Sequence, residues 1–248
     1  MILSHSHKFI VFKTRKTGGT SFEIALSKYM ASEDVVTPVA PDDEKIRSAL
    51  GYTGPRNYVP DVAGKAGEGV QAVKFYNHIG AAEVRSMIPA DRFGAYLKVA
   101  IVRNPFDYAV SWYFWERSRV AETSRDDFQK WLRFQYVKRP EIEAEYRLNQ
   151  RPNPGMFSSN RFITHVDGRC AVDRMLRYEH MQEDVAEFAH QVGLPVSLGS
   201  EFRAIRAKGN YRPAAATARV MFENFSDGQE MIKTAFSDEI ATHNYQLT

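Results

Sequence analysis

The sequence predicts an α/β fold in which helices flank a central, mostly parallel sheet in three layers. Two observations carry this prediction. Short apolar runs rich in β-formers alternate with segments of helical periodicity, and turn or capping residues stand at the junctions. Repeated strand-to-helix units are typical of a sheet covered on both faces. The 248 residues suit a single domain spanning residues 1–248.

The first strand-to-helix unit opens the chain. Phe9-Ile-Val-Phe12 is a short apolar run and predicts a buried strand. A glycine pair, Gly18 and Gly19, follows it, and apolar residues then recur at helical spacing from Thr20 to Met30. A strand, a loop and a helix therefore stand in order.

The second unit is predicted from the strand Val70–Phe75 and the helix Gly80–Met87. It follows a different kind of segment, residues 32–69, in which prolines and glycines break every periodic pattern except a short helix near Asp43–Leu50. An irregular connection of this length in a compact domain is usually functional or mobile. We expect residues 32–69 to cover a site.

The third unit has the clearest signals. Leu97–Val102 predicts a strand, Asn104 a helix N-cap, and Pro105 occupies the first helical position. Asp107 adds a negative charge to the first turn, and the helix continues through Trp115. The remaining elements expected are helices over Asp126–Val137, His180–Val192 and Asp227–Ala241, a loop over Pro152–Asn160 and a strand over Arg174–Tyr178.

Composition excludes several classes of protein. Hydrophobic residues make up 44% and charged residues 25%, and the net charge is +3. Lysine and arginine are scattered singly, which argues against a nucleic-acid binder and favours a pocket for a small anion. A single cysteine, Cys170, excludes an internal disulfide and a cysteine-based zinc site. The chain shows no secretory signal or membrane-spanning run, so we expect a cytoplasmic protein. Its oligomeric state is not readable from the sequence.

The segment Lys13-Thr-Arg-Lys-Thr-Gly-Gly-Thr-Ser21 predicts an anion-binding loop. A glycine turn that leads into a helix offers unpaired N–H groups at the positive end of the helix dipole. Lys16 adds a full positive charge, and Thr20 and Ser21 are expected to cap the helix. A simple strand-to-helix turn is the alternative. Because Lys16 precedes both glycines, the loop is not a Walker A motif, which argues against an ordinary nucleotide hydrolase or kinase.

Two motifs carry a family resemblance. Lys16-Thr-Gly-Gly-Thr-Ser21 resembles the 5′-phosphosulfate loop of sulfotransferases that use 3′-phosphoadenylyl sulfate, in particular the Golgi carbohydrate subgroup and its soluble bacterial relatives. Val102-Arg-Asn-Pro-Phe-Asp-Tyr-Ala-Val-Ser-Trp-Tyr113 resembles their 3′-phosphate motif. Leu176–Asp184 looks like the Arg-Tyr-Glu segment of the family. Arg15 departs from the pattern, since relatives often have proline there.

The resemblance implies a P-loop-like fold and a metal-free reaction that leaves adenosine 3′,5′-bisphosphate. Lys16 would be catalytic because it follows charge onto the leaving phosphate. A basic loop late in the chain, residues 205–213, would close over the nucleotide, although a solvated loop is the alternative. The implied donor-binding residues are Arg15, Lys16, Thr17, Gly18, Gly19, Thr20, Ser21, Arg103, Ser111, Lys208 and Arg212.

The acceptor needs a base, because a hydroxyl must lose its proton when it attacks sulfur. His78 is our candidate, since it is expected beside the anion loops. Lys74 and Glu83 are alternatives, and a purely structural histidine is the competing interpretation. The acceptor is expected to be a hydroxyl or amine on a carbohydrate or small metabolite.

Three further alternatives stay open. Trp112, Tyr113 and Trp115 either stack on a ligand or belong to the core. The alternatives to a sulfotransferase are a P-loop kinase-like phosphotransferase and a nucleotide-binding relative without catalytic activity.

Overall fold

The computed structural model describes residues 1–59, 74–117, 124–205, 207 and 212–248. The chain forms two compact units. The first combines Met1–Val102 with Ile163–Ala207, and the second combines Arg103–Phe162 with Lys208–Thr248. Each unit is assembled from two separated stretches of the sequence, and a single domain over residues 1–248 stays a prediction.

The first unit contains a five-stranded mixed sheet in the order β3-β1-β2-β4-β7. Its strands are β1 (Ile2–Ser4), β2 (Phe9–Phe12), β3 (Val35–Val36), β4 (Leu97–Val102) and β7 (Arg174–Arg177). β4 pairs in parallel with both β2 and β7, whereas β1 pairs antiparallel with β2 and β3. The short return between β1 and β2 enforces the antiparallel pairing, because parallel neighbours need a long crossover. The α/β class is confirmed, but the predicted mostly parallel sheet is mixed, because β1 pairs antiparallel on both sides.

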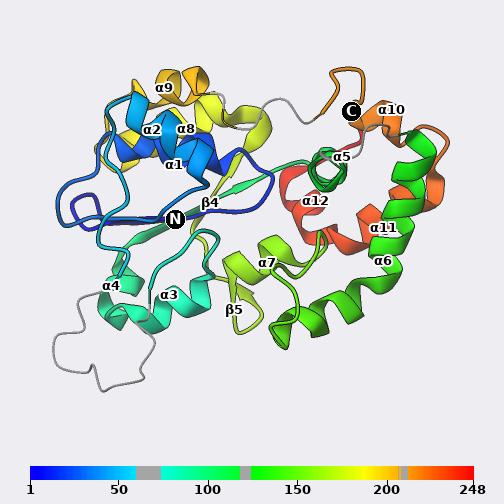
Figure 1. Ribbon diagram of the computed structural model, residues 1–248, viewed down its shortest axis with the longest axis horizontal. Coiled ribbons are helices and arrows are strands. Elements are labelled where there is room, and N and C mark those ends of the chain that lie inside the picture. The colour runs from blue at the N-terminus through cyan, green and yellow to red at the C-terminus, as the bar shows by residue number, and fades with distance from the viewer. Residues whose placement is uncertain (60–73, 118–123, 206, 208–211) are drawn as a thin grey trace. The chain divides into compact units, whose positions relative to one another are not determined.

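Helices cover both faces of this sheet (Figure 1). They are α1 (Gly19–Ser27), α2 (Pro41–Ala49), α3 (Ala81–Met87), α4 (Ala90–Ala95), α8 (Met181–Gln191) and α9 (Leu198–Ala204), with a 3₁₀ turn at Tyr178–His180. α1, α8 and α9 lie against one face and α3 against the other. A small hairpin, β5 (His165–Val166) and β6 (Arg169–Cys170), completes the unit.

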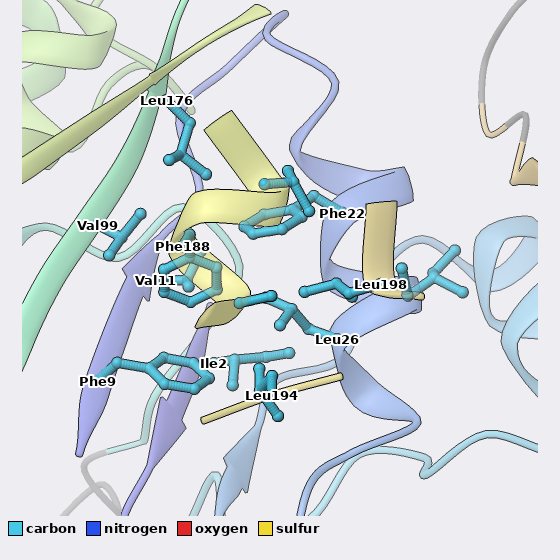
Figure 2. Close-up of a cluster of buried hydrophobic side chains, with 14 of the residues drawn as sticks. Ile2, Phe9, Val11, Phe22, Leu26, Val99, Leu176, Phe188, Leu194 and Leu198 are labelled. Carbon is cyan, nitrogen blue, oxygen red and sulfur yellow. The ribbon is translucent and has the colours of Figure 1, made fainter. Parts of the chain in front are cut away.

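The two faces explain why β2 is apolar throughout. Successive side chains of a strand point to opposite faces. Phe9 and Val11 therefore pack with Phe22 of α1 and Phe188 of α8 (Figure 2), and Ile10 and Phe12 pack on the side of α3. Because both faces are buried, an unbroken apolar run replaces the alternating pattern of a half-exposed strand.

The second unit is helical in its described part. It contains α5 (Pro105–Glu116), α6 (Arg125–Arg147), α10 (Ala218–Met221), α11 (Ser226–Ala235) and α12 (Ser237–His243), and α7 (Ser159–Thr164) begins in it. Its core is aromatic, and Trp112 and Tyr113 are fully buried there, with Trp115 partly buried against them. These aromatics therefore belong to the core, the second of the two interpretations offered by the sequence.

Several predicted elements differ from those observed. Residues 70–73 of the predicted strand lie outside the described residues, and Lys74 and Phe75 are not in a strand. The segment 32–69 holds β3 as well as α2, and residues 60–69 lie outside the description. The predicted last helix is two helices, α11 and α12, separated at Phe236. α6 extends ten residues beyond Val137, to Arg147.

Candidate functional site

The loop between β2 and α1 has a backbone that only particular residues adopt readily. α1 begins at Gly19, and Gly18 precedes it with a φ of 79°. A Cβ on Gly18 would lie 3.1 Å from the ring of Tyr178, and one on Gly19 would lie 3.0 Å from Cγ of Lys13. Lys16 also adopts a left-handed φ, 59°, which is uncommon outside glycine and concentrates at functional sites.

Two threonines fix this loop to the end of β4. Thr14 Oγ1 donates to the carbonyl of Ile101 at 2.7 Å, and the hydroxyls of Thr14 and Thr17 lie 2.7 Å apart. Since the Thr14 proton goes to Ile101, the Thr17 hydroxyl is the donor of this pair, and the Thr14 carbonyl, at 3.3 Å, is a second acceptor for it. Thr17 is fully buried. Of the predicted donor-binding residues, Thr17 thus has its hydroxyl engaged inside the loop.

The first turn of α1 differs from the prediction. Gly18 is the N-cap residue, and it makes no side-chain cap hydrogen bond. The expectation that Thr20 and Ser21 cap it is wrong, because both already lie within the helix, one and two positions after Gly19. The Ser21 hydroxyl instead accepts a hydrogen bond from the N–H of Ala207 at 3.3 Å. The half-buried Lys16, Gly18 and Thr20 and the buried Gly19 stand where the chain turns into the helix.

Lys13 belongs to a buried charge cluster beneath the loop. Its Nζ lies 2.9 Å from Glu23 Oε2, and the two side chains are 3% and 2% exposed. The other oxygen of Glu23 accepts from the Met1 amino group at 2.7 Å and from the Thr37 hydroxyl at 3.0 Å. Burial raises the pKa of Glu23, but the Lys13 and Met1 cations outweigh it and hold that pKa well below its usual range. Sequence reasoning missed this pairing.

His78 contacts the same loop. Its Nδ1 lies 2.7 Å from the carbonyl oxygen of Lys13. A carbonyl only accepts, so Nδ1 carries the proton and Nε2 keeps its lone pair. Burial, followed by the charges of Arg15 and Lys13, holds the pKa of His78 well below 6.5. Its imidazole is therefore neutral at pH 7 and can accept a proton at Nε2.

His78 reaches the loop by a route other than the predicted one. It lies in a turn before α3, with a left-handed φ of 64°, and does not directly follow a strand of the sheet. Histidine tolerates this conformation better than most residues. Of the alternative bases, Lys74 is exposed, and Glu83 lies on α3 and accepts from the Tyr76 hydroxyl at 2.6 Å.

In the second unit, α5 begins as the sequence predicted. Asn104 is the N-cap, its side chain accepts from the N–H of Phe106 at 3.1 Å, and Pro105 occupies the first turn. Arg103 stands immediately before this cap. The guanidinium of Arg103 contacts Asp107 Oδ2 through Nε at 2.6 Å and through Nη2 at 2.5 Å.

Arg212 meets the same carboxylate. Its Nη1 lies 2.5 Å from Asp107 Oδ1, and its Nε donates to the carbonyl of Ala216 at 2.6 Å. Burial raises the pKa of Asp107, but the two guanidiniums outweigh that effect and lower it. The structure therefore brings together Arg103 and Arg212, two predicted phosphate ligands that are far apart in sequence.

Two other predicted donor-binding residues, Ser111 and Lys208, belong to this unit. Ser111 is half-buried on α5, one helical turn after Asp107. Lys208 lies outside the described residues. The linking role of Asp107 was missed, because Arg103 lies outside α5 and Arg212 is distant in sequence, so neither contact follows from helical spacing. The sequence predicts for Asp107 only a negative charge in the first turn of the helix.

The described part of the chain contains no group of three or more side chains suited to hold a metal ion. None of its helices combines the length and apolar character that a membrane crossing requires. Comparisons with protein-family models, with curated proteins and with solved structures found no match.

Proposed function

We propose that the protein is a sulfotransferase that moves a sulfuryl group from 3′-phosphoadenylyl sulfate to a hydroxyl or amine. The observation that carries the proposal is the pair Arg103 and Arg212, joined through Asp107 at the start of α5. Guanidinium pairs are well suited to phosphate because their N–H groups match its oxygens in geometry and charge. A P-loop-like, three-layer arrangement belongs to the same proposal, and the sheet covered on both faces supports it.

The loop after β2 would hold the 5′-phosphosulfate. Gly18, the N-cap of α1, has no side chain to cap the N–H groups of the first turn, and Lys16 stands at the turn. These are the donors that an oxyanion needs at a helix N-terminus. Arg15 and Thr20 flank them. The arginine pair, with Ser111 on α5, would hold the 3′-phosphate.

The reaction would be an in-line displacement at sulfur. The acceptor oxygen or nitrogen forms the new bond to sulfur, and the bond from sulfur to the bridging phosphate oxygen breaks. Adenosine 3′,5′-bisphosphate leaves with the electron pair, and Lys16 stabilises the charge that builds there. Positioning and electrostatics suffice for such transfers, so the proposal includes no metal ion.

His78 would take the acceptor proton at Nε2, the nitrogen left with a lone pair by the Lys13 carbonyl. Its low pKa makes it a weaker base than an imidazole near pKa 7. A bound donor brings several negative charges close to it, and nearby anions raise the pKa of a histidine. We therefore propose that His78 becomes an effective base once the donor is bound. A carbohydrate or small metabolite is the proposed acceptor.

The test combines binding with transfer. Calorimetric titration with adenosine 3′,5′-bisphosphate in the presence of EDTA should show micromolar or tighter binding. Radiolabelled sulfate should then move from the donor to members of a panel of sugars, alcohols and amines. Strict dependence on ATP and Mg²⁺ would establish a kinase-like phosphotransferase instead. Binding without transfer or donor hydrolysis would leave a non-catalytic nucleotide-binding protein.

A further inference from the structure

The carboxylate of Asp107 lies between two guanidiniums in the second unit. Arg103 contacts one of its oxygens and Arg212 the other, and all three ion-pair distances lie between 2.5 and 2.6 Å. We propose that Asp107 is a positioning residue that sets Arg103 and Arg212 as one preformed phosphate clamp. It thereby gives the site its preference for a 3′-phosphate over a 3′-hydroxyl. This inference rests on the proposed function and goes beyond it.

The first step is electrostatic. Two guanidiniums repel each other, and a carboxylate between them removes that repulsion. One acid against two arginines still leaves a net positive charge, so the cluster stays attractive to a phosphate. The side chains of Arg103, Arg212 and Asp107 are 10%, 23% and 25% exposed. At this depth water screens the interaction less than at an open surface.

The second step is geometric. A guanidinium is planar, so two contacts fix its orientation. Arg103 uses Nε and Nη2 on Asp107. Arg212 uses Nη1 on Asp107 and Nε on the carbonyl of Ala216. Both planes are therefore set before a ligand arrives, which lowers the ordering cost of binding.

The third step places the clamp on a rigid element. Asp107 and Ser111 lie one turn apart on α5 and share one face of the helix, and Arg103 stands immediately before its N-cap, Asn104. Asn104 caps this helix through the N–H of Phe106, which fixes its first turn. The helix N-terminus adds its own positive end. This positive end stabilises a negatively charged phosphate but not a neutral hydroxyl.

The experiment measures a ratio of affinities. Adenosine 3′,5′-bisphosphate and adenosine 5′-phosphate are titrated separately into the full chain by calorimetry. In Asp107→Asn, which keeps the shape and removes the charge, affinity for the bisphosphate should fall about tenfold, the scale of a charge-assisted hydrogen bond. Affinity for the monophosphate should change less than about twofold. Asp107→Glu keeps the charge and should recover part of the preference.

The possible outcomes separate the two proposals. An unchanged ratio, tighter binding of the bisphosphate, or equal loss on both ligands in Asp107→Asn overturns the positioning role while the sulfotransferase proposal stands. A wild-type protein that binds neither nucleotide overturns the proposed function and this inference with it. If Asp107→Asn does not fold, Arg212→Lys is measured instead. It keeps the charge but loses the planar fork, and an unchanged ratio there overturns the inference equally.

Discussion

Two carboxylates accompany the predicted anion-binding residues, one in each unit, and they differ in burial and in partners. Glu23 is 2% exposed and pairs with Lys13 and the Met1 amino group. Asp107 is 25% exposed and joins Arg103 to Arg212. The first carboxylate binds its lysine inside the protein, where no solute reaches it. The second holds its arginines at a partly exposed helix start.

Burial and the partner acid also distinguish the two lysines of the loop. Lys13 and Lys16 are three residues apart in the predicted anion-binding loop, and only Lys16 was predicted to bind the donor. Lys13 is buried against Glu23, whereas Lys16 is half-buried at a left-handed turn. Both lysines carry the same charge, but Lys13 is buried and paired with an acid and so has a structural role. Lys16 remains the proposed ligand.

The largest expected effect comes from Glu23→Gln. The variant keeps the shape of the side chain but leaves Lys13 buried without its acid, and it should lower the free energy of unfolding by about 3–5 kcal/mol. Urea denaturation at pH 7 measures the change. Glu201→Gln, at a partly exposed acid paired with Lys28, is the matched control and should cost about 1 kcal/mol or less. A Glu23→Gln variant as stable as the control would contradict a buried structural pair.

Lys16→Ala addresses the other lysine. Removal of one transition-state charge donor should lower turnover by about 10²–10³-fold, and the unfolding free energy should stay within about 1 kcal/mol of wild type. Steady-state transfer of labelled sulfate measures turnover. Lys45→Ala, at an exposed lysine paired with Asp42, serves as the control and should transfer at the wild-type rate. Normal turnover in Lys16→Ala would refute the assigned role.

His78→Ala should lower turnover by about 10²-fold, the lower end for a general base because its pKa lies well below 7. Affinity for adenosine 3′,5′-bisphosphate should be unchanged, since the imidazole contacts the loop only through the Lys13 carbonyl among the hydrogen bonds described. Transfer rates and calorimetry measure the two effects. His190→Ala, an exposed histidine on α8, is the control. Equal turnover in the two variants would eliminate His78 as the base.

Arg103→Ala tests one arginine of the pair that Asp107 joins. Loss of one guanidinium should weaken binding of adenosine 3′,5′-bisphosphate by about 1.5–3 kcal/mol, the scale of charge-assisted hydrogen bonds. Calorimetric titration gives the dissociation constant. Arg133→Ala, at an exposed arginine paired with Asp227 in the same unit, controls for the general loss of positive charge. Unchanged affinity in Arg103→Ala would remove it from the proposed phosphate site.

Local signals in the sequence were sufficient for much of the fold. The strands Phe9–Phe12 and Leu97–Val102 appear with the predicted bounds, because apolar runs bounded by turn residues leave little choice. The cap at Asn104 and Pro105 is confirmed for the same reason. β1 and β3 were missed, since strands of three and two residues are too short to show alternation. Their pairing depends on distant partners.

Prediction of the candidate site from the sequence has the same limit, because contacts with distant residues are not encoded locally. The glycines of the loop were found because their conformational requirement is local. The Tyr178 ring against Gly18, and Glu23 beneath Lys13, depend on the packing of the sheet and α1. No spacing rule indicates such contacts. The contacts of Asp107 are of the second kind, because Arg103 stands before the N-cap of α5 and Arg212 is far away in the sequence.

The smallest expected effect is the pH dependence of stability that His78 imposes. Its pKa is lowered in the folded protein by burial and by Arg15 and Lys13, whereas in the unfolded chain it returns to about 6.5. Below about pH 6.5 the unfolded chain therefore binds one more proton than the folded protein, and acidification favours unfolding. This one group changes the free energy of unfolding by at most about 1.4 kcal/mol per pH unit. Its effect disappears above about pH 7. Urea denaturation at pH 7 and pH 5.5 should show a smaller loss of stability in His78→Gln than in wild type. Equal losses would mean that burial, together with Arg15 and the Lys13 held by Glu23, does not keep the imidazole neutral in the folded protein.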